Sequence, residues 1–235
     1  MTTEWRVFAN PDALIDALAG ALQAEATAAI AARGVFHLVL AGGSTPRALY
    51  QVLAERDAGD ARWHIWYGDE RCLPTDHAER NSVVVESVWL AASRIPAGNR
   101  RPIPAERGAA EAAEVYAGWL AGVPDFDVAL LGMGEDGHTA SLFPGRDWGT
   151  EADSPDVLAV AGAPKPPPER VSLSAARLNR SAKVWFVITG TSKRDALRQW
   201  QGGEALPVAA VHGREETAAW LDAVAWPADD HRWQG

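Results

Sequence analysis

The sequence predicts an α/β fold, with a mainly parallel, Rossmann-like sheet in three layers and helices on both faces. Continuous apolar runs of strand length occur at 35–41, 126–131 and 183–189, and such runs are typical of parallel strands covered on both sides. Segments with helical patterns separate these runs, and each run ends in a turn rich in glycine, hydroxyl or charged residues. The alternation predicts a single α/β domain over residues 1–235.

The elements of the first half follow from their start and stop signals. Asp12 to Ala32 is rich in Ala and Leu, lacks proline and precedes Gly34, which predicts a long amphipathic helix. After the strand at 35–41, Pro46 predicts the first turn of a helix that reaches about Arg56. The further elements expected here are a strand at 62–67, a helix at 82–92, an irregular segment at 95–104, a helix at 107–120 and the strand at 126–131.

The second half begins with loops and ends with a shorter strand–helix alternation. We expect a short strand at 157–161, a stiff proline-rich loop at 162–168 and a helix that starts at Ser174. The elements expected after these are the strand at 183–189, a helix to about Trp200, a strand at 208–212 and a helix at 215–223.

Composition limits the classes of function. The net charge of −9 disfavours nucleic acid and anionic membranes as partners, so an anionic ligand needs a local cluster of Arg and Lys. The single cysteine, Cys72, excludes an internal disulfide and a cysteine-based zinc site. No apolar run approaches the length of a membrane span and the N-terminus lacks a signal-peptide pattern, so we expect a cytoplasmic protein. The tryptophans are expected to be packing residues.

The turn after the strand at 126–131 carries the most specific pattern, Gly132-Met-Gly134-Glu-Asp136-Gly-His138. Its glycines allow a sharp turn and a close approach to a ligand. A dinucleotide fingerprint shares this glycine spacing, but it requires a long helix afterwards, and Pro144 and Gly145 leave no room for one. A plain turn with a helix-capping histidine is the other alternative.

Gly42, Gly43, Ser44 and Thr45 follow the strand at 35–41 and precede the helix at Pro46. Free N–H groups and the positive end of a helix dipole form an anion site in such a turn, although a simple capped turn explains the residues equally well. The turn is not a P-loop, because the Gly-Lys-Ser/Thr ending is absent.

Five loops, each after an expected strand, should meet at one edge of the parallel sheet. They span 42–45, 68–74, 132–138, 162–170 and 190–193. The polar side chains that they bring to this edge are Ser44, Thr45, Asp69, Arg71, Asp136, His138, Arg170 and Lys193. Three cations in an acidic chain indicate a phosphate, and one histidine without a nucleophile elbow indicates acid–base chemistry.

Four motifs at these positions resemble a known family. Leu40-Ala-Gly-Gly-Ser-Thr-Pro46, Trp66-Tyr-Gly-Asp-Glu-Arg71, Leu131 to Pro144 and Glu169-Arg-Val-Ser-Leu-Ser174 are similar to 6-phosphogluconolactonases, in order and spacing, along nearly the whole chain. The resemblance implies the fold shared with glucosamine-6-phosphate deaminase (NagB) and ribose-5-phosphate isomerase (RpiA). It implies hydrolysis of 6-phosphogluconolactone in the oxidative pentose phosphate pathway, with no cofactor and no metal.

The resemblance also implies roles for single residues. The position of His138 is that of the base, Arg71 that of a substrate contact, and Arg170 and Lys193 those of phosphate ligands. From the residues themselves, either Asp136 or Asp69 would orient the imidazole, and either Arg71 or the amides of a glycine turn such as Gly134 would stabilise the oxyanion. Gly42, Gly43, Ser44 and Thr45 would bind phosphate with Arg170 and Lys193.

Two other functions share these features. A glucosamine-6-phosphate deaminase or isomerase has a similar glycine turn with histidine and a strand-end aspartate, but Thr139 to Pro144 and Glu70-Arg71 favour the lactonase. A non-catalytic sugar-phosphate sensor would need a DNA-binding segment, for which the residues before Val35 have neither the length nor the charge. We expect a small sugar phosphate as the ligand and a monomer or weak homo-oligomer. His37, His64, His77, His212 and His231 are expected to be structural or solvated.

Overall fold

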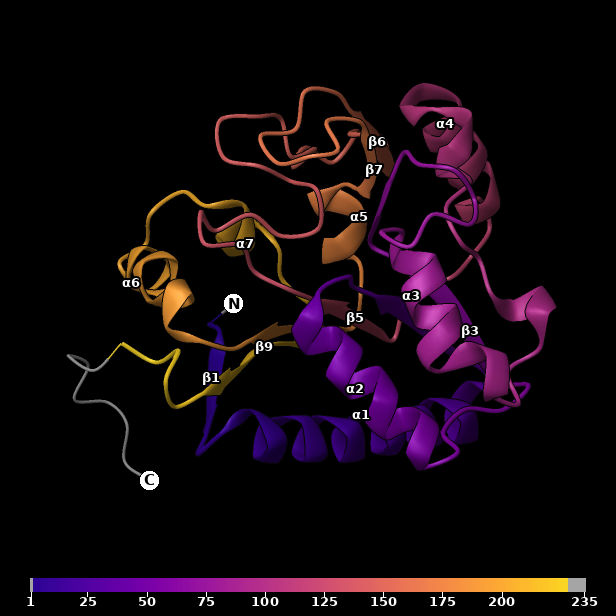
Figure 1. The fold of residues 1–235 in the computed structure, drawn as a ribbon, viewed down its shortest axis with the longest axis horizontal. Helices are drawn as coiled ribbons and strands as arrows, with labels where there is room; N and C mark the ends of the chain where they lie inside the picture. Colours follow the sequence, from indigo (N-terminus) through magenta and orange to yellow (C-terminus); the bar gives the residue numbers. More distant parts are fainter. Residues whose placement is uncertain (1, 228–235) are drawn as a thin grey trace.

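The computed structural model describes residues 2–227, and His231 lies outside the described residues. A parallel sheet with strand order β1-β9-β8-β5-β2-β3 forms the centre of the molecule, and a small antiparallel sheet, β4-β7-β6, lies above it (Figure 1). The strands are β1 (Glu4–Phe8), β2 (Phe36–Leu40), β3 (Trp63–Tyr67), β4 (Asp69–Arg71), β5 (Val128–Leu131), β6 (Val157–Val160), β7 (Arg170–Leu173), β8 (Lys183–Ile188) and β9 (Glu216–Asp222). The α/β fold with a mainly parallel sheet is confirmed.

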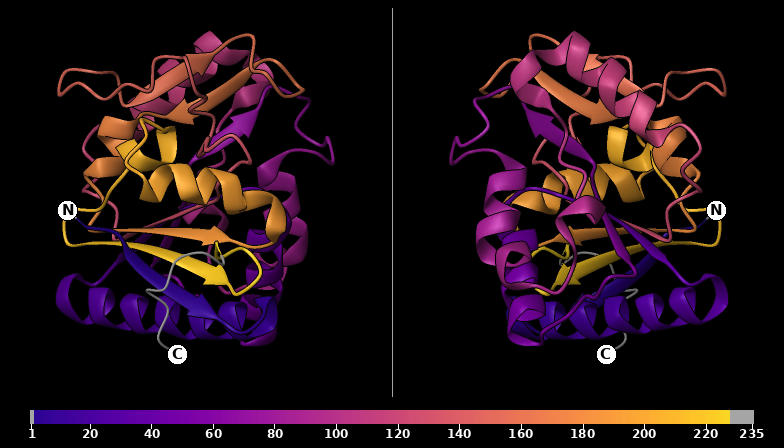
Figure 2. Two further views of the ribbon diagram at one scale, coloured as in Figure 1. Left: turned by 90° about the vertical axis from the view of Figure 1, so that its left-hand side faces the viewer. Right: turned by 90° about the vertical axis from the view of Figure 1, so that its right-hand side faces the viewer.

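Helices cover both faces of the central sheet. Figure 2 shows α1 along one face and α6 on the opposite face. The helices are α1 (Pro11–Arg33), α2 (Ser44–Glu55), α3 (Asn81–Val88), α4 (Ala109–Leu120), α5 (Ala175–Asn179), α6 (Arg194–Gln201) and α7 (Pro207–Ala210), with 3₁₀ turns η1 (Leu90–Ala92), η2 (Ala97–Asn99), η3 (Ala105–Arg107) and η4 (Thr191–Lys193). Helix α4 packs on the small sheet, against β6 and β7.

Helix α1 differs from one expectation. By its length and mean hydropathy, it would suffice to cross a membrane, whereas the sequence was expected to hold no such run. Its apolar side, with Leu14, Leu18 and Leu22 fully buried, packs on the sheet from β9 to β2. Asn10 caps its first turn by accepting from the N–H of Ala13, and Gly34 ends it in the left-handed conformation.

The last part of the chain was assigned wrongly from the sequence. The segment expected to be a helix, 215–223, forms β9 in the interior of the central sheet, and the segment expected to be a strand, 208–212, begins as the short helix α7. Alanines at 218 and 219 favour a helix locally, but pairing with β1 and β8 on both sides buries the segment. Short apolar runs do not distinguish the two structures. The edge strand β1 was not predicted.

The loop at 162–170 was expected to follow a strand of the central sheet. It instead joins β6 to β7 of the small sheet. The two strands pair antiparallel, and β7 also pairs with β4, so that Arg170 lies opposite Arg71. Loops 42–45, 68–74, 132–138 and 190–193 follow β2, β3, β5 and β8, which are neighbours in the sheet. Their common position at the carboxyl edge of the central sheet is confirmed. Arg170 lies near that edge because β7 pairs with β4.

The start of β2 carries a buried histidine whose ionisation opposes folding. His37 is 7% exposed, and its Nδ1 accepts a hydrogen bond from Trp66 Nε1 at 3.2 Å. Burial, together with the nearby charge of His64, lowers the pKa of His37 from 6.5 to about 4. The unfolded chain therefore binds this proton more readily between these pH values, so stability is full above about pH 6.5 and falls as the pH drops toward 4.

We expect wild-type protein to lose about 2 kcal/mol more unfolding free energy than His37→Gln between pH 7 and pH 4.5. The glutamine keeps an acceptor near Trp66 but has no proton to gain. Urea unfolding curves of both proteins at the two pH values measure the difference. Equal losses would show that His37 is not the group responsible.

Candidate active site

The turn after β5 places the imidazole of His138 against a carboxylate. His138 Nδ1 lies 2.5 Å from Asp136 Oδ1, and the backbone N–H of Gly134 donates to the carbonyl of His138 at 2.8 Å. The carboxylate oxygen can only accept, so Nδ1 carries the proton and Nε2 has a free lone pair. The His138 side chain is 18% exposed, which leaves the imidazole accessible to a small molecule.

Glycine is required at position 134 for this arrangement. A Cβ atom there would lie 2.0 Å from His138 Nδ1 and 2.5 Å from Asp136 Oδ1. Gly137 has a φ of +77°, and its Cβ would lie 2.9 Å from Leu206. Gly134 therefore makes room for the contact between Asp136 and His138, and Gly137 allows the backbone turn between them.

The protonation states of the pair suit proton abstraction. Burial lowers the pKa of His138 below its usual 6.5, and the hydrogen bond and charge of Asp136 oppose this only in part. Burial raises the pKa of Asp136, but the hydrogen bond and charge of His138 outweigh it, so that this pKa is lowered. The resting state is thus an aspartate beside a neutral imidazole, which is the form that accepts a proton.

The pH dependence of turnover follows from these directions. We expect kcat for a reaction that needs neutral His138 to rise with pH through a midpoint below 6.5 and to be constant at pH 7. Asp136→Asn removes a charge that raises this pKa, so its acid limb should move to lower pH while its plateau falls. Initial rates, corrected for the spontaneous reaction, give both profiles. An acid limb that moves upward in Asp136→Asn would contradict the assignment.

Asp69, at the start of β4, is buried and has other partners than the imidazole. Its Oδ2 accepts from the hydroxyl of Ser141 at 2.6 Å, and its Oδ1 from Asn81 Nδ2 at 3.2 Å. Ser141 belongs to the segment after His138, and Asn81 is the first residue of α3. Asp69 therefore connects α3 to the segment 132–141, which we call the histidine turn. The carboxylate that contacts His138 is that of Asp136.

Glu70 was expected only to form part of a motif, and the structure shows that its side chain has a specific structural role. Its carboxylate is fully buried and accepts from the backbone N–H groups of Arg71, Asn81 and Ser82 at 2.8–2.9 Å. Arg80 Nε lies 3.6 Å from the same group. Glu70 thus caps α3 from the neighbouring strand and fixes the residues on either side of it, Asp69 and Arg71.

The first glycine turn opens on a cavity of about 580 Å³. Helix α2 begins at Ser44 after Gly43, whose φ is +113°, and no side chain of the described residues caps it. Its first N–H groups are therefore available to an anion. The cavity is lined by Gly42, Gly43, Ser44, Arg47, Arg71 and Asn81 among others, and His138 is not among its lining residues. Arg71 thus faces this turn, while its Nη1 donates to the carbonyl of Glu79.

Two of the expected phosphate ligands, Thr45 and Lys193, lie on adjoining loops. Thr45 Oγ1 is 2.7 Å from the hydroxyl of Thr189, at the end of β8. Lys193 is in η4, and burial lowers the pKa of its ammonium group, opposed by the charges of Glu135 and Asp136. The charge of Lys165, in the proline-rich loop, lowers the pKa of both Lys193 and His138, so this lysine lies near the two residues. It was not predicted.

Arg170 is 7% exposed and binds the proline-rich loop. Its Nε and Nη2 donate to the carbonyls of Lys165, Pro166 and Pro167 at 3.0–3.3 Å. Its guanidinium lies 5.7 Å from the ring centre of Phe143, which in turn lies 4.9 Å from the imidazole of His138. Among the described residues Nη1 has no partner, so one edge of the guanidinium remains for a ligand.

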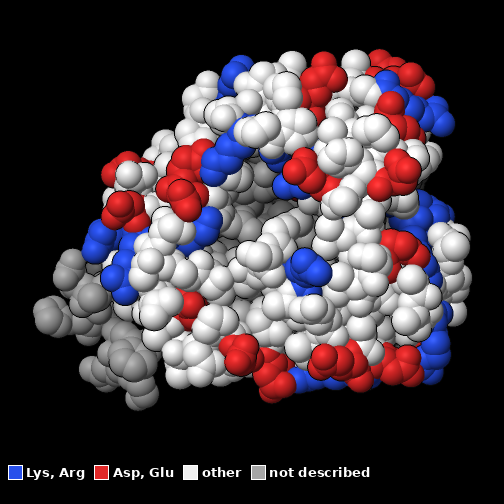
Figure 3. All heavy atoms as spheres, in the orientation of Figure 1, with Lys and Arg blue, Asp and Glu red and all other residues white. Residues whose placement is uncertain are grey.

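A chain of contacts connects the first glycine turn to the segment that carries His138. Gly42 lies against Asn81, because a Cβ at Gly42 would lie 1.9 Å from Asn81 Oδ1. Asn81 donates to Asp69, and Asp69 accepts from the hydroxyl of Ser141, three residues after His138. Figure 3 shows a hollow in this face above α2, with basic side chains around its rim. Within residues 2–227 no group of three or more His, Cys, Asp or Glu side chains is placed to hold a metal ion.

Arg47, Asn81 and Ser141 are site residues that sequence reasoning did not single out. Ser141 stands three residues after His138, and Arg47 stands three residues after Ser44. Their closeness in sequence to predicted site residues was the signal that could have identified them. Asn81 had no local signal, because its role depends on the contact between α3 and β4.

The fold and the site define an α/β protein with a histidine–aspartate pair and an uncapped helix start at the carboxyl edge of a parallel sheet. The family of glucosamine-6-phosphate isomerases and 6-phosphogluconolactonases matches residues 9–220, and the chain belongs to this family.

Individual relatives agree. The chain is 35% identical over 239 residues to a 6-phosphogluconolactonase of Mycobacterium leprae, covering 94% of this chain and 96% of that protein. It is 40% identical over 200 residues to the rabbit GDH/6PGL endoplasmic bifunctional protein, covering 80% of this chain and 25% of that protein, so it spans about a quarter of the latter. The crystal structure of 6-phosphogluconolactonase from Thermotoga maritima superposes with a TM-score of 0.86 at 29% identity, covering 94% of this chain and all of that chain.

Proposed function

We propose that this protein hydrolyses 6-phosphoglucono-1,5-lactone to 6-phosphogluconate, with His138 as the general base. The observation that carries the proposal is the His138–Asp136 pair beside anion-binding turns. A neutral imidazole with a free Nε2 has the form a base requires. The relatives named 6-phosphogluconolactonase support the substrate.

The proposed reaction has two steps. Nε2 of His138 takes a proton from water as the oxygen attacks C1, which gives a tetrahedral intermediate with a negatively charged oxygen. The C1–ring-oxygen bond then breaks, and the imidazolium returns the proton to the leaving ring oxygen. Asp136 stabilises the imidazolium and fixes its orientation. A lactone is reactive enough that no covalent intermediate with the protein is required.

Phosphate binding places C1 beside the imidazole in this proposal. The first N–H groups of α2, with Ser44 and Arg71 at the 580 Å³ cavity, form the phosphate end. Lys193, which is near Glu135 and Asp136, and Arg170, which lies against Phe143, would add positive charge around the substrate. Amides of the turn at Gly134 are candidate donors for the oxyanion.

The assay of the purified protein compares two substrates. We expect hydrolysis of fresh 6-phosphoglucono-1,5-lactone well above its spontaneous rate, and no ammonia from glucosamine 6-phosphate. Ammonia release at a rate similar to lactone hydrolysis would favour the deaminase. Binding of 6-phosphogluconate without either activity would favour a sugar-phosphate sensor.

The wider assignment follows from this activity. We propose that the protein acts in the oxidative pentose phosphate pathway of the cytoplasm, on a small sugar phosphate and without a cofactor. We further propose that it works as a single domain and as a monomer or weak homo-oligomer.

A further inference from the structure

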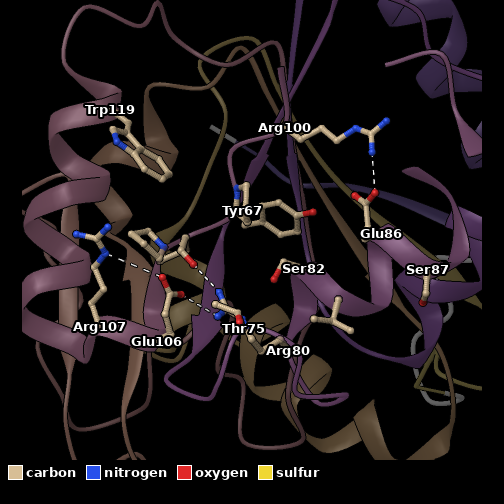
Figure 4. A pocket seen from close by; sticks show the side chains of 14 residues that line it. Tyr67, Thr75, Arg80, Ser82, Glu86, Ser87, Arg100, Glu106, Arg107 and Trp119 are labelled. Atoms are coloured by element: carbon tan, nitrogen blue, oxygen red, sulfur yellow. Dashed lines mark hydrogen bonds and ion pairs between the residues drawn. The ribbon is translucent and has the colours of Figure 1, made fainter. Parts of the chain in front are cut away.

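A second pocket of about 560 Å³ lies between α3, the segment 100–107 and α4 (Figure 4). None of the residues assigned to the catalytic or phosphate-binding site lines it. Its volume is within the range of pockets that enclose a small organic molecule. The pocket is therefore separate from the opening at which His138 lies.

Two largely buried residues present their hydroxyl groups to this pocket. Tyr67 is 2% exposed and Ser82 is 9% exposed, and among the described residues neither hydroxyl has a hydrogen-bond partner. The other two tyrosines differ, because Tyr50 and Tyr116 donate to the carbonyls of Ala41 and Tyr67 at 2.7 and 3.1 Å. The side chains of Tyr67 and Ser82 line the pocket instead, where their hydroxyls are free to hydrogen-bond a ligand.

The charged groups of the pocket are already paired with one another. Arg100 Nη1 lies 2.7 Å from Glu86, and Arg80 Nη1 lies 2.9 Å from Glu106. Arg107, at the rim, pairs with Glu111 at 3.2 Å. The pocket thus has no unpaired guanidinium to bind phosphate, which distinguishes its chemistry from that of the catalytic site.

The remaining lining of the pocket is largely apolar. Pro102 and Pro104 line the pocket together with the indole of Trp119, which is 40% exposed and is labelled in Figure 4. A planar ring can stack on the indole while its polar edge reaches Tyr67 and Ser82. We propose that this pocket binds an uncharged, planar heteroaromatic compound of nucleoside size.

The position of the pocket connects such a ligand to the catalytic site. Ser82 belongs to the first turn of α3, and its N–H is bound by Glu70. Asn81, one residue earlier, binds Asp69 on the other side of the helix. A ligand that holds Ser82 therefore contacts the turn that positions Asp69 and Arg71.

The test is a titration of the whole protein, labelled with nitrogen-15, followed through the indole signal of Trp119. The signal is assigned by its loss in Trp119→Phe. The probes are adenosine, guanosine, cytidine and uridine at millimolar concentrations. We expect at least one of them to shift the signal saturably, and 6-phosphogluconate neither to shift it nor to displace the nucleoside.

Variants of the two hydroxyls make the test specific. Tyr67→Phe and Ser82→Ala should each weaken nucleoside binding about fivefold, since each removes one hydrogen bond. Ser87→Ala is the matched control and should not change it, because that hydroxyl donates to the Val84 carbonyl at 2.9 Å. The proposal is overturned if no nucleoside moves the Trp119 signal, if binding is unchanged in both hydroxyl variants, or if 6-phosphogluconate competes with it.

Discussion

Replacement of His138 by alanine is expected to lower kcat for lactone hydrolysis by about 10²- to 10⁴-fold, which is the contribution of a positioned general base. The imidazole has a free nitrogen, Nε2, and its other nitrogen is fixed by Asp136. KM should change little, because the proposed phosphate end of the site is built from other loops. Initial rates over a range of lactone concentrations separate the two constants.

The control for this variant is His212→Ala, which removes an exposed histidine remote from these contacts and should leave kcat unchanged. Urea unfolding of His138→Ala should show a folded protein, since its side chain makes one hydrogen bond, to Asp136. If His138→Ala hydrolysed the lactone at the wild-type rate, the assignment of the base would be wrong.

Glu70→Ala is expected to have the largest effect on stability, a loss of about 3–5 kcal/mol in unfolding free energy. The change leaves buried N–H groups of Arg71, Asn81 and Ser82 without an acceptor, beside a buried Arg80. Such a loss is a large part of the stability of a typical protein. Urea unfolding at pH 7 measures it.

Two further variants show whether burial is the cause. Glu106→Ala removes the other carboxylate partner of Arg80, but this one is 31% exposed, so the cost should be about 1 kcal/mol. Glu70→Gln keeps one oxygen acceptor and should fall between the two alanine variants. A Glu70→Ala protein as stable as Glu106→Ala would show that the buried carboxylate does not hold α3.

The sequence was most informative where local chemistry decides the structure. The glycine turns, the start of α1 and the strands β2, β5 and β8 have signals within a few residues, and these elements occur as expected. Segment 216–222 was misassigned because its alanines favour a helix, and only pairing with β1 and β8 makes it a strand. The pairing of β9 with β1 is between segments more than 200 residues apart, so no local sequence pattern indicates it.

The same distinction applies to the site. The residue types at 136 and 138 predicted a pair that the structure places in contact, although the sequence left Asp69 as an equal alternative. The roles of Glu70 and Asn81 depend on the packing of α3 against β4. The position of Arg170 depends on the pairing of β7 with β4. Tyr67 and Ser82 read as ordinary strand and helix residues, because an unpartnered hydroxyl is visible only once its neighbours are known.

The most direct test of the proposed mechanism is a crystal structure of the protein with 6-phosphogluconate, the product. We predict that the product carboxylate lies within hydrogen-bond distance of Nε2 of His138 and that its phosphate lies at the first turn of α2, near Ser44 and Arg71. A product bound with its carboxylate remote from His138, or with its phosphate remote from α2, would contradict the mechanism.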